Sequence, residues 1–239
     1  MNKVYAVADL HGMYNLWCKI KEKLDETDIL YILGDCGDRG SDGWKIIKEA
    51  LLDPRVKYIR GNHDQMLIDS WKREWNEGSI FIWMCNGGAP TFDAILNDPK
   101  AAIFIEELNK TPTYCSYENK NGQTIHLSHA GFSLHENNAL PDNKDLLWDR
   151  DHIDDHCDWW PEQNPNDYVV HGHTGCVSSI FKRNSYAFGD IDFNKSKTIC
   201  KYAHGHKICI DGRSFLTNQI AILDLDTLQE EVIYGEDID

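Results

Sequence analysis

The chain is poor in basic residues. It has 24 Lys and Arg against 39 Asp and Glu in 239 residues, which gives a formal net charge of −15. A broad surface for nucleic acid needs a basic stripe, so this balance argues against extended nucleic-acid binding. The same charge repels a phosphate-bearing substrate, which must then be held by a local positive site. A metal centre would provide one.

Long apolar runs and paired cysteines are also missing. No stretch approaches the ~20 apolar residues of a membrane-spanning helix, and the opening MNKVYAVADLHG turns polar too early for a signal peptide. The eight cysteines are scattered without a CxxC pair, which favours reduced thiols over a disulfide framework or a zinc knuckle. We therefore expect a cytoplasmic protein with no membrane partner.

The first 60 residues alternate between apolar runs and stretches of helical periodicity. Strands are predicted at 3–8, 28–33 and 56–60, with helices at 14–24 and 42–52 between them. This order indicates an α/β fold, in which ligands collect outside the carboxyl ends of the strands.

The rest of the chain is expected to complete one domain over residues 1–239. Residues 64–110 are predicted to be mostly helical and to form an insertion or cap. A β-hairpin is predicted at 113–117 and 123–128, around Asn121-Gly122. The acidic, Trp-bearing stretch 133–166 is predicted to be a long surface loop. Further short strands are predicted at 168–170, 207–210, 219–225 and 231–234.

Ligand-type residues occur where the predicted strands end. Asp35 closes the second strand, with Asp38 and Arg39 three and four residues further on. Two carboxylates and an arginine at the mouth of a buried strand are costly unless they bind something charged. The hypothesis is that Asp35 bridges two metal ions. Other strand ends supply further candidate ligands: Asp9, His11, Asn62, His63, His129, His171 and His173.

The residue types narrow the choice of metal and of reaction. Mixed oxygen and imidazole ligands favour Mn²⁺, Fe or Zn²⁺ over Ca²⁺, and the absence of Cys at these ends argues against a structural zinc. Two ions ~3.5–4 Å apart can clamp the attacking and leaving oxygens of an in-line phosphoryl displacement. The pattern therefore predicts hydrolysis of a phosphate ester.

Five motifs follow one another along the chain: Asp9-Leu-His11-Gly12, Gly34-Asp35-Cys-Gly-Asp38-Arg39-Gly40, Arg60-Gly61-Asn62-His63-Asp64, His129-Ala-Gly131 and Gly172-His173-Thr174. Their order and spacing resemble those of the calcineurin-like metallophosphoesterases. The second and third resemble more closely the phosphoprotein phosphatases of bacteriophage-lambda type and the symmetrical diadenosine-tetraphosphate hydrolases. Asn86-Gly87-Gly88 and Trp148-Asp149-Arg150 resemble weaker marks of that branch. The resemblance covers roughly residues 1–225 and implies a four-layer α/β/β/α sandwich with mixed sheets.

The resemblance also implies a cofactor and its ligands. It implies two divalent ions, Mn²⁺ before Fe, Zn or Ni. The implied ligands of the first metal are Asp9, His11 and Asp35, and those of the second are Asp35, Asn62, His129 and His173.

The same resemblance implies the catalytic roles. His63 is similar to the family's general acid for the leaving oxygen, with Asp38 hydrogen-bonded to it. The implied phosphate clamps are Arg39, Arg60 and Arg150, since a guanidinium fork matches phosphate oxygens.

The sequence departs from the family pattern in two places. The late strand ends in Asp211-Gly212-Arg213 instead of the usual Asp-Thr-Gly, which leaves the local shape beside the second metal open. The Gly-His-x-His ending of the wider superfamily is absent because Thr174-Gly175 follow His173, as in the protein phosphatase branch.

Three functions are compatible with these residues. The first is a Ser/Thr protein phosphatase, and the second is a hydrolase of diadenosine tetraphosphate or a related dinucleotide. The third is a metal-binding adaptor without catalysis, against which the intact His63, Asp38 and Arg39 argue.

Other polar and aromatic residues have simpler interpretations. His171 is expected to be structural, His204 and His206 to lie at the surface or on the substrate side, and Cys36 to pack in the core. The aromatic run at Phe81 and Trp83 favours core packing over base stacking. The acidic run 149–158, with His152 and His156, is expected to be a solvated loop and not a further cation site.

Overall fold

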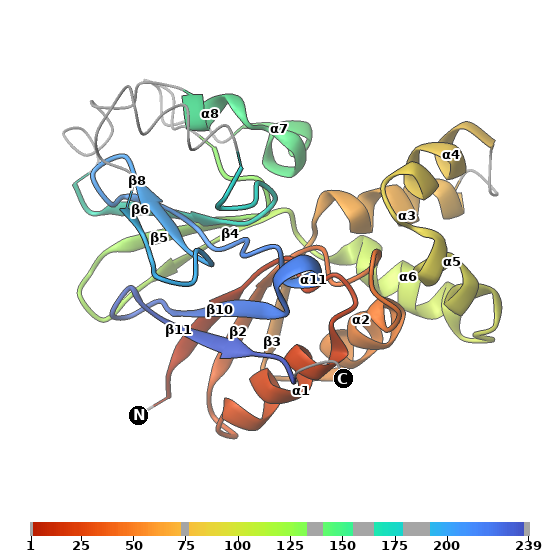
Figure 1. Ribbon diagram of the computed structural model, residues 1–239, viewed down its shortest axis with the longest axis horizontal. Helices are drawn as coiled ribbons and strands as arrows, with labels where there is room; N and C mark the ends of the chain where they lie inside the picture. The colour runs from red at the N-terminus through yellow and green to blue at the C-terminus, as the bar shows by residue number, and fades with distance from the viewer. Residues whose placement is uncertain (1, 73–76, 133–140, 155–164, 179–191, 237–239) are drawn as a thin grey trace.

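Two sheets form the centre of the molecule in the computed structural model, which describes residues 2–72, 77–132, 141–154, 165–178 and 192–236 (Figure 1). The first sheet has the strand order β11-β10-β1-β2-β3, formed by Gln229–Tyr234, Gln219–Asp224, Val4–Val7, Ile29–Leu33 and Val56–Ile59. The strands β1, β2 and β3 are parallel, and β10 pairs antiparallel with β1. Parallel neighbours need a crossover connection, which is usually a helix.

The second sheet has the order β4-β5-β6-β9-β8-β7, formed by Tyr114–Glu118, Thr124–Ser128, Asp167–His171, Lys207–Cys209, Cys200–Tyr202 and Asp192–Phe193. The strands β4 and β5 form the predicted antiparallel hairpin, while β5, β6 and β9 are parallel. Both sheets are therefore mixed.

An apolar core fills the space between the sheets. Alternate residues of β1 divide between its two faces, so Val4 and Ala6 contact the second sheet while Tyr5 and Val7 face the helices. Ile125 and Val170 complete this inner layer from the second sheet.

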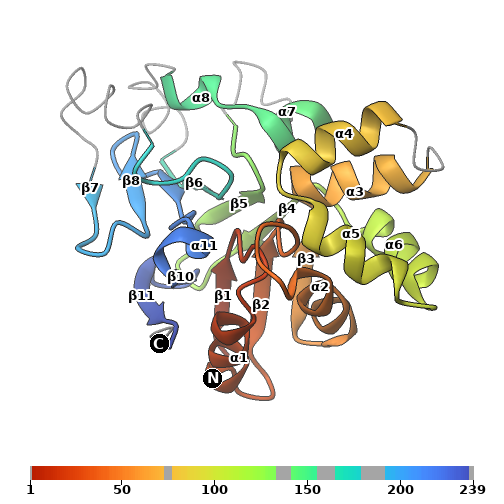
Figure 2. The same ribbon diagram turned by 45° about the vertical axis from the view of Figure 1, so that its right-hand side comes forward.

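Helices cover the outer faces of both sheets. The helices α1 (Tyr14–Lys23) and α2 (Gly43–Leu52) lie under the first sheet in Figures 1 and 2. The helices α7 (Asn143–Trp148) and α8 (Asp151–Asp154) lie over the second, where Leu146 packs against Val169. These layers confirm the predicted α/β/β/α class.

Four helices follow β3 in the chain and lie beside the first sheet: α3 (Asn62–Lys72), α4 (Glu77–Cys85), α5 (Ala89–Leu96) and α6 (Ala101–Lys110) (Figure 2). Residues 64–110 are mostly helical in their described part, as predicted, but the first helix begins two residues earlier. Asn62 and His63 therefore lie in the first turn of α3. No helix within the described ranges is long and apolar enough to cross a membrane.

The prediction of one long surface loop at 133–166 is wrong for its described part, which contains α7 and α8. The Asp142 side chain accepts hydrogen bonds from the backbone N–H groups of Lys144 and Asp145 and so caps α7. Leu146 and Leu147 are buried, and this packing stabilises a helix too short to show periodicity. The sequence prediction also omitted β7, β8 and the short helix α11 (Ser214–Thr217).

Candidate metal centre

The candidate ligands gather at the carboxyl ends of strands from both sheets. Parallel strands end at the same edge, so side chains that follow them can converge. The residues and the strands that they follow are Asp9 after β1, Asp35 after β2, Asn62 after β3, His129 after β5 and His173 after β6.

The loops after β1 and β2 are joined by backbone hydrogen bonds. The N–H of His11 donates to the carbonyl of Asp35 at 2.9 Å, and the N–H of Gly40 donates to the carbonyl of His11 at 3.0 Å. These bonds fix the position of Asp9 and His11 relative to Asp35.

Two motif glycines make room for ligand carboxylates. A Cβ at Gly61 would lie 2.1 Å from Asp35 Oδ1, and one at Gly172 would lie 2.0 Å from Asp9 Oδ2. A residue just after each glycine donates its backbone N–H to that same oxygen at 3.0 Å: His63, two residues after Gly61, to Asp35, and His173, directly after Gly172, to Asp9. Each carboxylate is therefore oriented by a backbone N–H group. The main chain can approach the carboxylate this closely only because the nearby residue is glycine.

Several site residues have left-handed backbone conformations, which cost of order 1–3 kcal/mol each for residues other than glycine. The positive φ angles belong to Asp9 (55°), His11 (43°), Asp35 (57°), Asp38 (67°), Arg39 (64°) and His173 (64°). Strain concentrated in this way is typical of a functional site.

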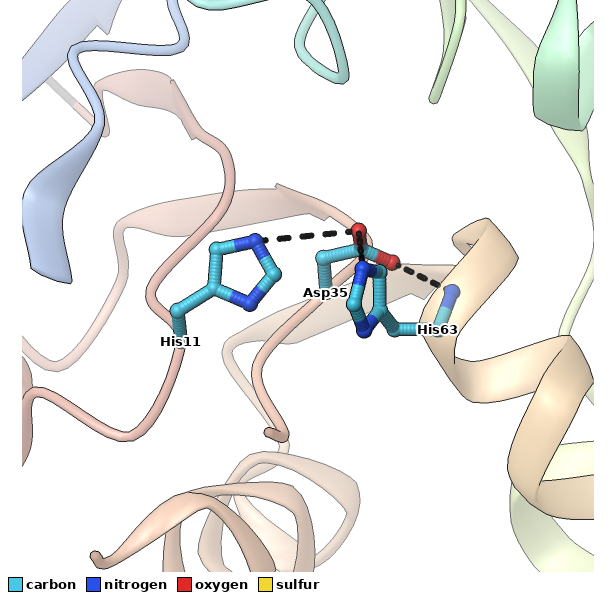
Figure 3. Close-up of side chains that lie close together, drawn as sticks. All are labelled: His11, Asp35 and His63. Carbon is cyan, nitrogen blue, oxygen red and sulfur yellow. Dashed lines mark hydrogen bonds and ion pairs between the residues drawn. The ribbon is translucent and has the colours of Figure 1, made fainter. Parts of the chain in front are cut away.

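Figure 3 shows one group of possible ligands, with His11 and His63 on either side of Asp35. The Nδ1–H of His11 donates to the carbonyl of Gly37 at 3.0 Å, which leaves its Nε2 lone pair toward the carboxylates. That Nε2 lies 3.7 Å from Asp9 Oδ1 and 3.9 Å from Asp35 Oδ2. His63 Nε2 is also 3.9 Å from Asp35 Oδ2, a spacing that by itself permits a ligand role for His63.

The second group converges on Asn62. Its Oδ1 is 2.7 Å from His129 Nε2 and 3.0 Å from His173 Nδ1. Asp35 Oδ2 is 3.3 Å from the same His129 nitrogen. His173 Nε2 is buried without a hydrogen-bond partner among the described residues. Asp35 Oδ2 thus lies near donors of both groups, His11 in the first and His129 in the second, as a carboxylate shared by two ions requires, and this donor set fits divalent metals.

Burial and neighbouring charges shift the proton affinities of the site. Burial alone would raise the pKa of Asp35, but His129 and His63 hold it well below its usual range. Burial lowers the pKa of His129, but the negative charge of Asp35 outweighs burial and raises this pKa to about 10. Burial, and then Asp211, raise the pKa of Asp9 well above its usual range. A cation would relieve both the desolvation and the like-charge repulsion at Asp9.

His63 and Asp38 form a buried pair. His63 Nδ1 lies 2.6 Å from Asp38 Oδ2, and His63 Nε2 faces Arg39. Two residues of the helical stretch hold Asp38. The Trp83 Nε1–H donates to Asp38 Oδ2 at 2.8 Å, and the backbone N–H of Asp38 donates to Thr91 Oγ1 at 2.7 Å. The expected core packing is correct for Trp83 but wrong for Phe81, which is 69% exposed. The sequence prediction also missed the contact of Trp83 with the acid pair.

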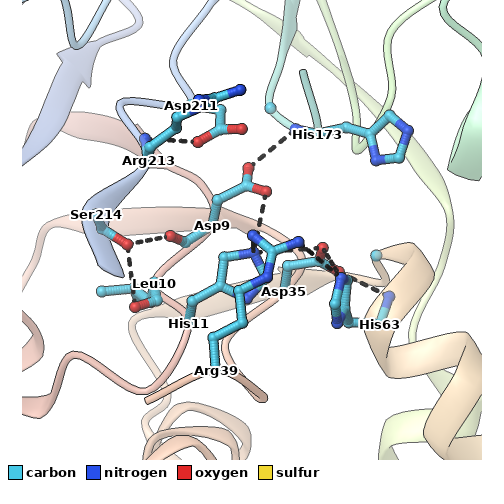
Figure 4. A network of polar contacts seen from close by, with 12 residues as sticks. Asp9, Leu10, His11, Asp35, Arg39, His63, His173, Asp211, Arg213 and Ser214 are labelled. Atoms are coloured by element: carbon cyan, nitrogen blue, oxygen red, sulfur yellow. Dashed lines mark hydrogen bonds and ion pairs between the residues drawn. The ribbon is translucent and has the colours of Figure 1, made fainter. Parts of the chain in front are cut away.

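The structure separates the three predicted phosphate clamps. Arg39 lies in the centre, with Nη1 2.8 Å from His11 Nε2 and Nη2 3.1 Å from His63 Nε2 (Figure 4). The pKa of Arg150 is lowered by its burial, an effect that the negative charges of Asp211 and Asp9 oppose. Arg60 instead donates from Nη1 to the carbonyl of Asn109 at 3.1 Å, at the end of α6.

Residues outside the predicted set also support the centre. Asp64 Oδ2 accepts the N–H groups of Gly61 at 2.8 Å and of Asp35 at 3.2 Å, which ties the β2 and β3 loops together. Asp211 follows β9 and is buried beside Asp9 (Figure 4). Asp211, the first residue of the Asp211-Gly212-Arg213 stretch, therefore lies at a sixth strand end of the site.

Three of the remaining described histidines have structural contacts. His171 is buried, with Nε2 2.8 Å from the Tyr202 hydroxyl. His206 donates to the carbonyl of Asp167 at 2.8 Å and stacks on Tyr168. His152 is buried and donates to the carbonyl of Ala130 at 2.8 Å, so it is not in a solvated loop as expected. His156 lies outside the described residues.

Comparison with known proteins defines the class of this chain. The family model described as calcineurin-like phosphoesterase matches residues 2–220, and the chain belongs to that family. Among curated proteins, it is 30% identical over 140 residues to a symmetrical bis(5'-nucleosyl)-tetraphosphatase of Buchnera aphidicola, covering 54% of this chain and 44% of that one. It is 33% identical over 88 residues to serine/threonine-protein phosphatase 1 of Salmonella typhimurium, covering 36% of this chain and 38% of that one. The chain thus spans less than half the length of these relatives.

Solved structures show the same fold at low sequence identity. A structure described as a candidate diadenosine tetraphosphatase has a TM-score of 0.63 at 14% identity, covering 99% of this chain and 95% of that one. A serine/threonine phosphatase from Saccharomyces cerevisiae has a TM-score of 0.59 at 13% identity, covering 100% and 81%. These similarities establish the architecture alone.

Proposed function

We propose that this protein is a dinuclear-metal phosphoesterase whose preferred substrates are phosphoserine and phosphothreonine in proteins. The observation that carries the proposal is the position of Asp35, which belongs to both groups of convergent ligands. The proposed ligands of the first ion are Asp9, His11 and Asp35. Those of the second are Asp35, Asn62, His129 and His173.

The proposed ions are Mn²⁺, with Fe, Zn²⁺ or Ni²⁺ as alternatives. Two bound ions would supply Lewis acidity at phosphorus and a water of lowered pKa as nucleophile. Hydrolysis is then direct, without a covalent intermediate on the protein.

The chain's own residues orient the substrate and move one proton. Arg39 holds phosphoryl oxygens with the fork that now faces His11 and His63, and Arg150, whose charge interacts with Asp211 and Asp9, adds positive charge. His63 donates its Nε2 proton to the leaving oxygen, while Asp38 holds Nδ1 and stabilises the imidazolium. Arg60 has no part in this proposal because it is anchored on α6.

A second substrate class is supported by the curated relatives. The match to the tetraphosphatase is longer than the match to the protein phosphatase, at 140 against 88 residues. Symmetrical hydrolysis of a dinucleoside tetraphosphate is therefore the alternative. A catalytically inactive adaptor has less support, because Asp38, His63 and Arg39 are in contact with one another.

Product analysis separates these possibilities. The metal-free protein is loaded with Mn²⁺ and offered a phosphoserine peptide or diadenosine tetraphosphate, with Asp35→Asn as the matched inactive variant. Orthophosphate released faster from the peptide supports the first substrate class, and ADP formed faster from the dinucleotide supports the second. If the wild type releases neither, or turnover survives complete chelation, the proposal is wrong.

We propose that the protein works in the cytoplasm on a phosphorylated substrate, and that residues 1–239 form one domain with 64–110 as its cap. The described cysteines are unpaired, which supports a reducing location.

A further inference from the structure

Phe215, in the short helix α11, lies against the centre from the side of the late strands. The centroid of its ring is 4.5 Å from Arg39 Cζ, and the guanidinium lies over the ring face. The same ring meets the His11 imidazole edge-on, at 5.5 Å between centroids and 80° between planes. Phe215 therefore contacts both the proposed phosphate clamp and a proposed ligand of the first metal.

The stem of Arg39 is fixed from the opposite side by the Asn86-Gly87-Gly88 turn. Its backbone N–H donates to the carbonyl of Gly87 at 2.9 Å. A Cβ at Gly87, where φ is +95°, would lie 3.0 Å from Arg39 Cγ, so a larger residue would displace the stem. Gly87 thus determines where the Arg39 side chain begins its course, but not where its charged end points.

The charged end of Arg39 has no carboxylate partner within ion-pair distance among the described residues. Its two terminal nitrogens face the Nε2 atoms of His11 and His63. Metal binding at His11 would occupy one of these atoms, and Arg39 would then need another support. The ring of Phe215 is in place to hold the guanidinium by cation–π attraction without using any of its N–H donors.

The helix that carries Phe215 is itself fixed to the metal loops. Ser214 donates its hydroxyl to the carbonyls of Asp9 and Leu10. The left-handed residues Arg213 (φ 55°) and Asn218 (φ 51°) bound the helix at both ends. Leu216 is 66% exposed, so the helix turns one side to the centre and the other to solvent.

We propose that Phe215 is a positioning residue, whose ring holds the guanidinium of Arg39 in the orientation that binds substrate phosphate. The inference rests on the proposed phosphoesterase function, in which Arg39 contacts the phosphoryl group. Attraction of this kind changes a binding constant by about 2- to 30-fold, depending on how far the pair is desolvated.

The first test compares two substitutions at one position. Phe215→Leu keeps apolar volume but removes the ring, whereas Phe215→Trp keeps a π face; Leu216→Ala is the control on the exposed side of the same helix. Because Arg39 is exposed, we expect Phe215→Leu in Mn²⁺-loaded protein to raise the dissociation constant of orthophosphate and the KM of the ester by about 2- to 5-fold. Phe215→Trp and Leu216→Ala should match the wild type, and Mn²⁺ content should be unchanged in all three variants.

A double-mutant comparison decides whether the effect acts through Arg39. In an Arg39→Met background, Phe215→Leu should weaken orthophosphate binding no further. Equal losses with and without the guanidinium would overturn the proposal and indicate a structural role, as would equal losses in the Leu and Trp variants.

A spectroscopic readout is independent of activity and of metal. In metal-free protein, the Arg39 Nε–H proton should resonate upfield because the carbon to which Nε is bonded, Cζ, lies over the ring, and Arg39→Met identifies that signal by its loss. Phe215→Leu should return the signal to the range of exposed arginines. The absence of an upfield signal in the wild type would refute the contact, whereas a wild type that hydrolyses no phosphate ester would refute only the proposed function.

Discussion

The hydrogen bond from Trp83 to Asp38 makes a quantitative test of the acid pair possible. Trp83 is fully buried, Asp38 is 2% exposed, and Asp38 Oδ2 receives both the Trp83 indole N–H and His63 Nδ1. Trp83→Phe removes the donor and leaves most of the aromatic packing. A hydrogen bond to a buried charged group contributes about 1.5–3 kcal/mol, so the variant should lose about that much free energy of unfolding.

The same loss should affect turnover through the orientation of His63. If all of the free energy reappears as displacement of the acid, kcat falls about 10- to 100-fold, because each 1.36 kcal/mol is about tenfold in rate. The fall should be large for an alkyl phosphate, whose leaving oxygen needs a proton, and small for p-nitrophenyl phosphate. Urea unfolding and steady-state kinetics at saturating Mn²⁺ measure the two effects.

Trp44→Phe is the matched control. The Trp44 indole also donates to a carboxylate, Asp98 Oδ2, at 2.8 Å, and Trp44 is also buried. It should lose stability without changing the dependence on leaving group. The reasoning is refuted if Trp83→Phe behaves as Trp44→Phe does, with reduced stability and unchanged kcat on the alkyl ester.

Three further predictions concern acid catalysis, metal binding and stability. His63→Asn should lower kcat on an alkyl phosphate by about 10²–10⁴-fold and on p-nitrophenyl phosphate much less, and equal losses would contradict the acid role. Because Asp35 raises the pKa of His129 to about 10, the ring must lose a proton to bind Mn²⁺. The apparent affinity for Mn²⁺ should therefore rise with pH, and calorimetry in two buffers of different ionisation enthalpy should detect the released proton. If no proton is released, His129 is not a ligand. The hydrogen bond from Lys48 lowers the pKa of Asp98 from 3.8 to about 2. The stability that this carboxylate contributes is therefore complete above its ordinary pKa and is lost as the pH falls through about 2. Asp98→Asn should flatten the dependence of the free energy of unfolding on pH in this range, and an unchanged acid slope would refute the pairing.

The fold and the central ligands could be predicted because their signals are local in the sequence. Each of the first three strands is a short apolar run followed at once by its polar residues, as at Asp9 and Asp35. Since parallel strands end at one edge, reading the strands was enough to expect convergence. Asp35 accordingly lies among the other candidates, as the motif order implied.

The residues that hold these groups could not be predicted because their contacts are distant in sequence. Trp83 is 45 positions from Asp38, and a buried aromatic in a helix has the same pattern whether or not its N–H finds a carboxylate. Phe215 follows a strand of three residues, too short to show alternation. Arg60 illustrates the opposite error: it adjoins the Asn62 motif, but its side chain leaves the strand end toward α6.

The distribution of candidate ligands between the sheets has a consequence for the integrity of the sandwich. Asp9, Asp35 and Asn62 follow strands of the first sheet, whereas His129 and His173 follow strands of the second. An ion held by both sets would cross-link the two halves at one edge of their shared apolar core. A ligand bound only by the folded state adds about 2.7 kcal/mol to the free energy of unfolding at a hundredfold excess over its Kd. Metal supply would then determine resistance to proteolysis as well as turnover, and protein without bound metal would be degraded first.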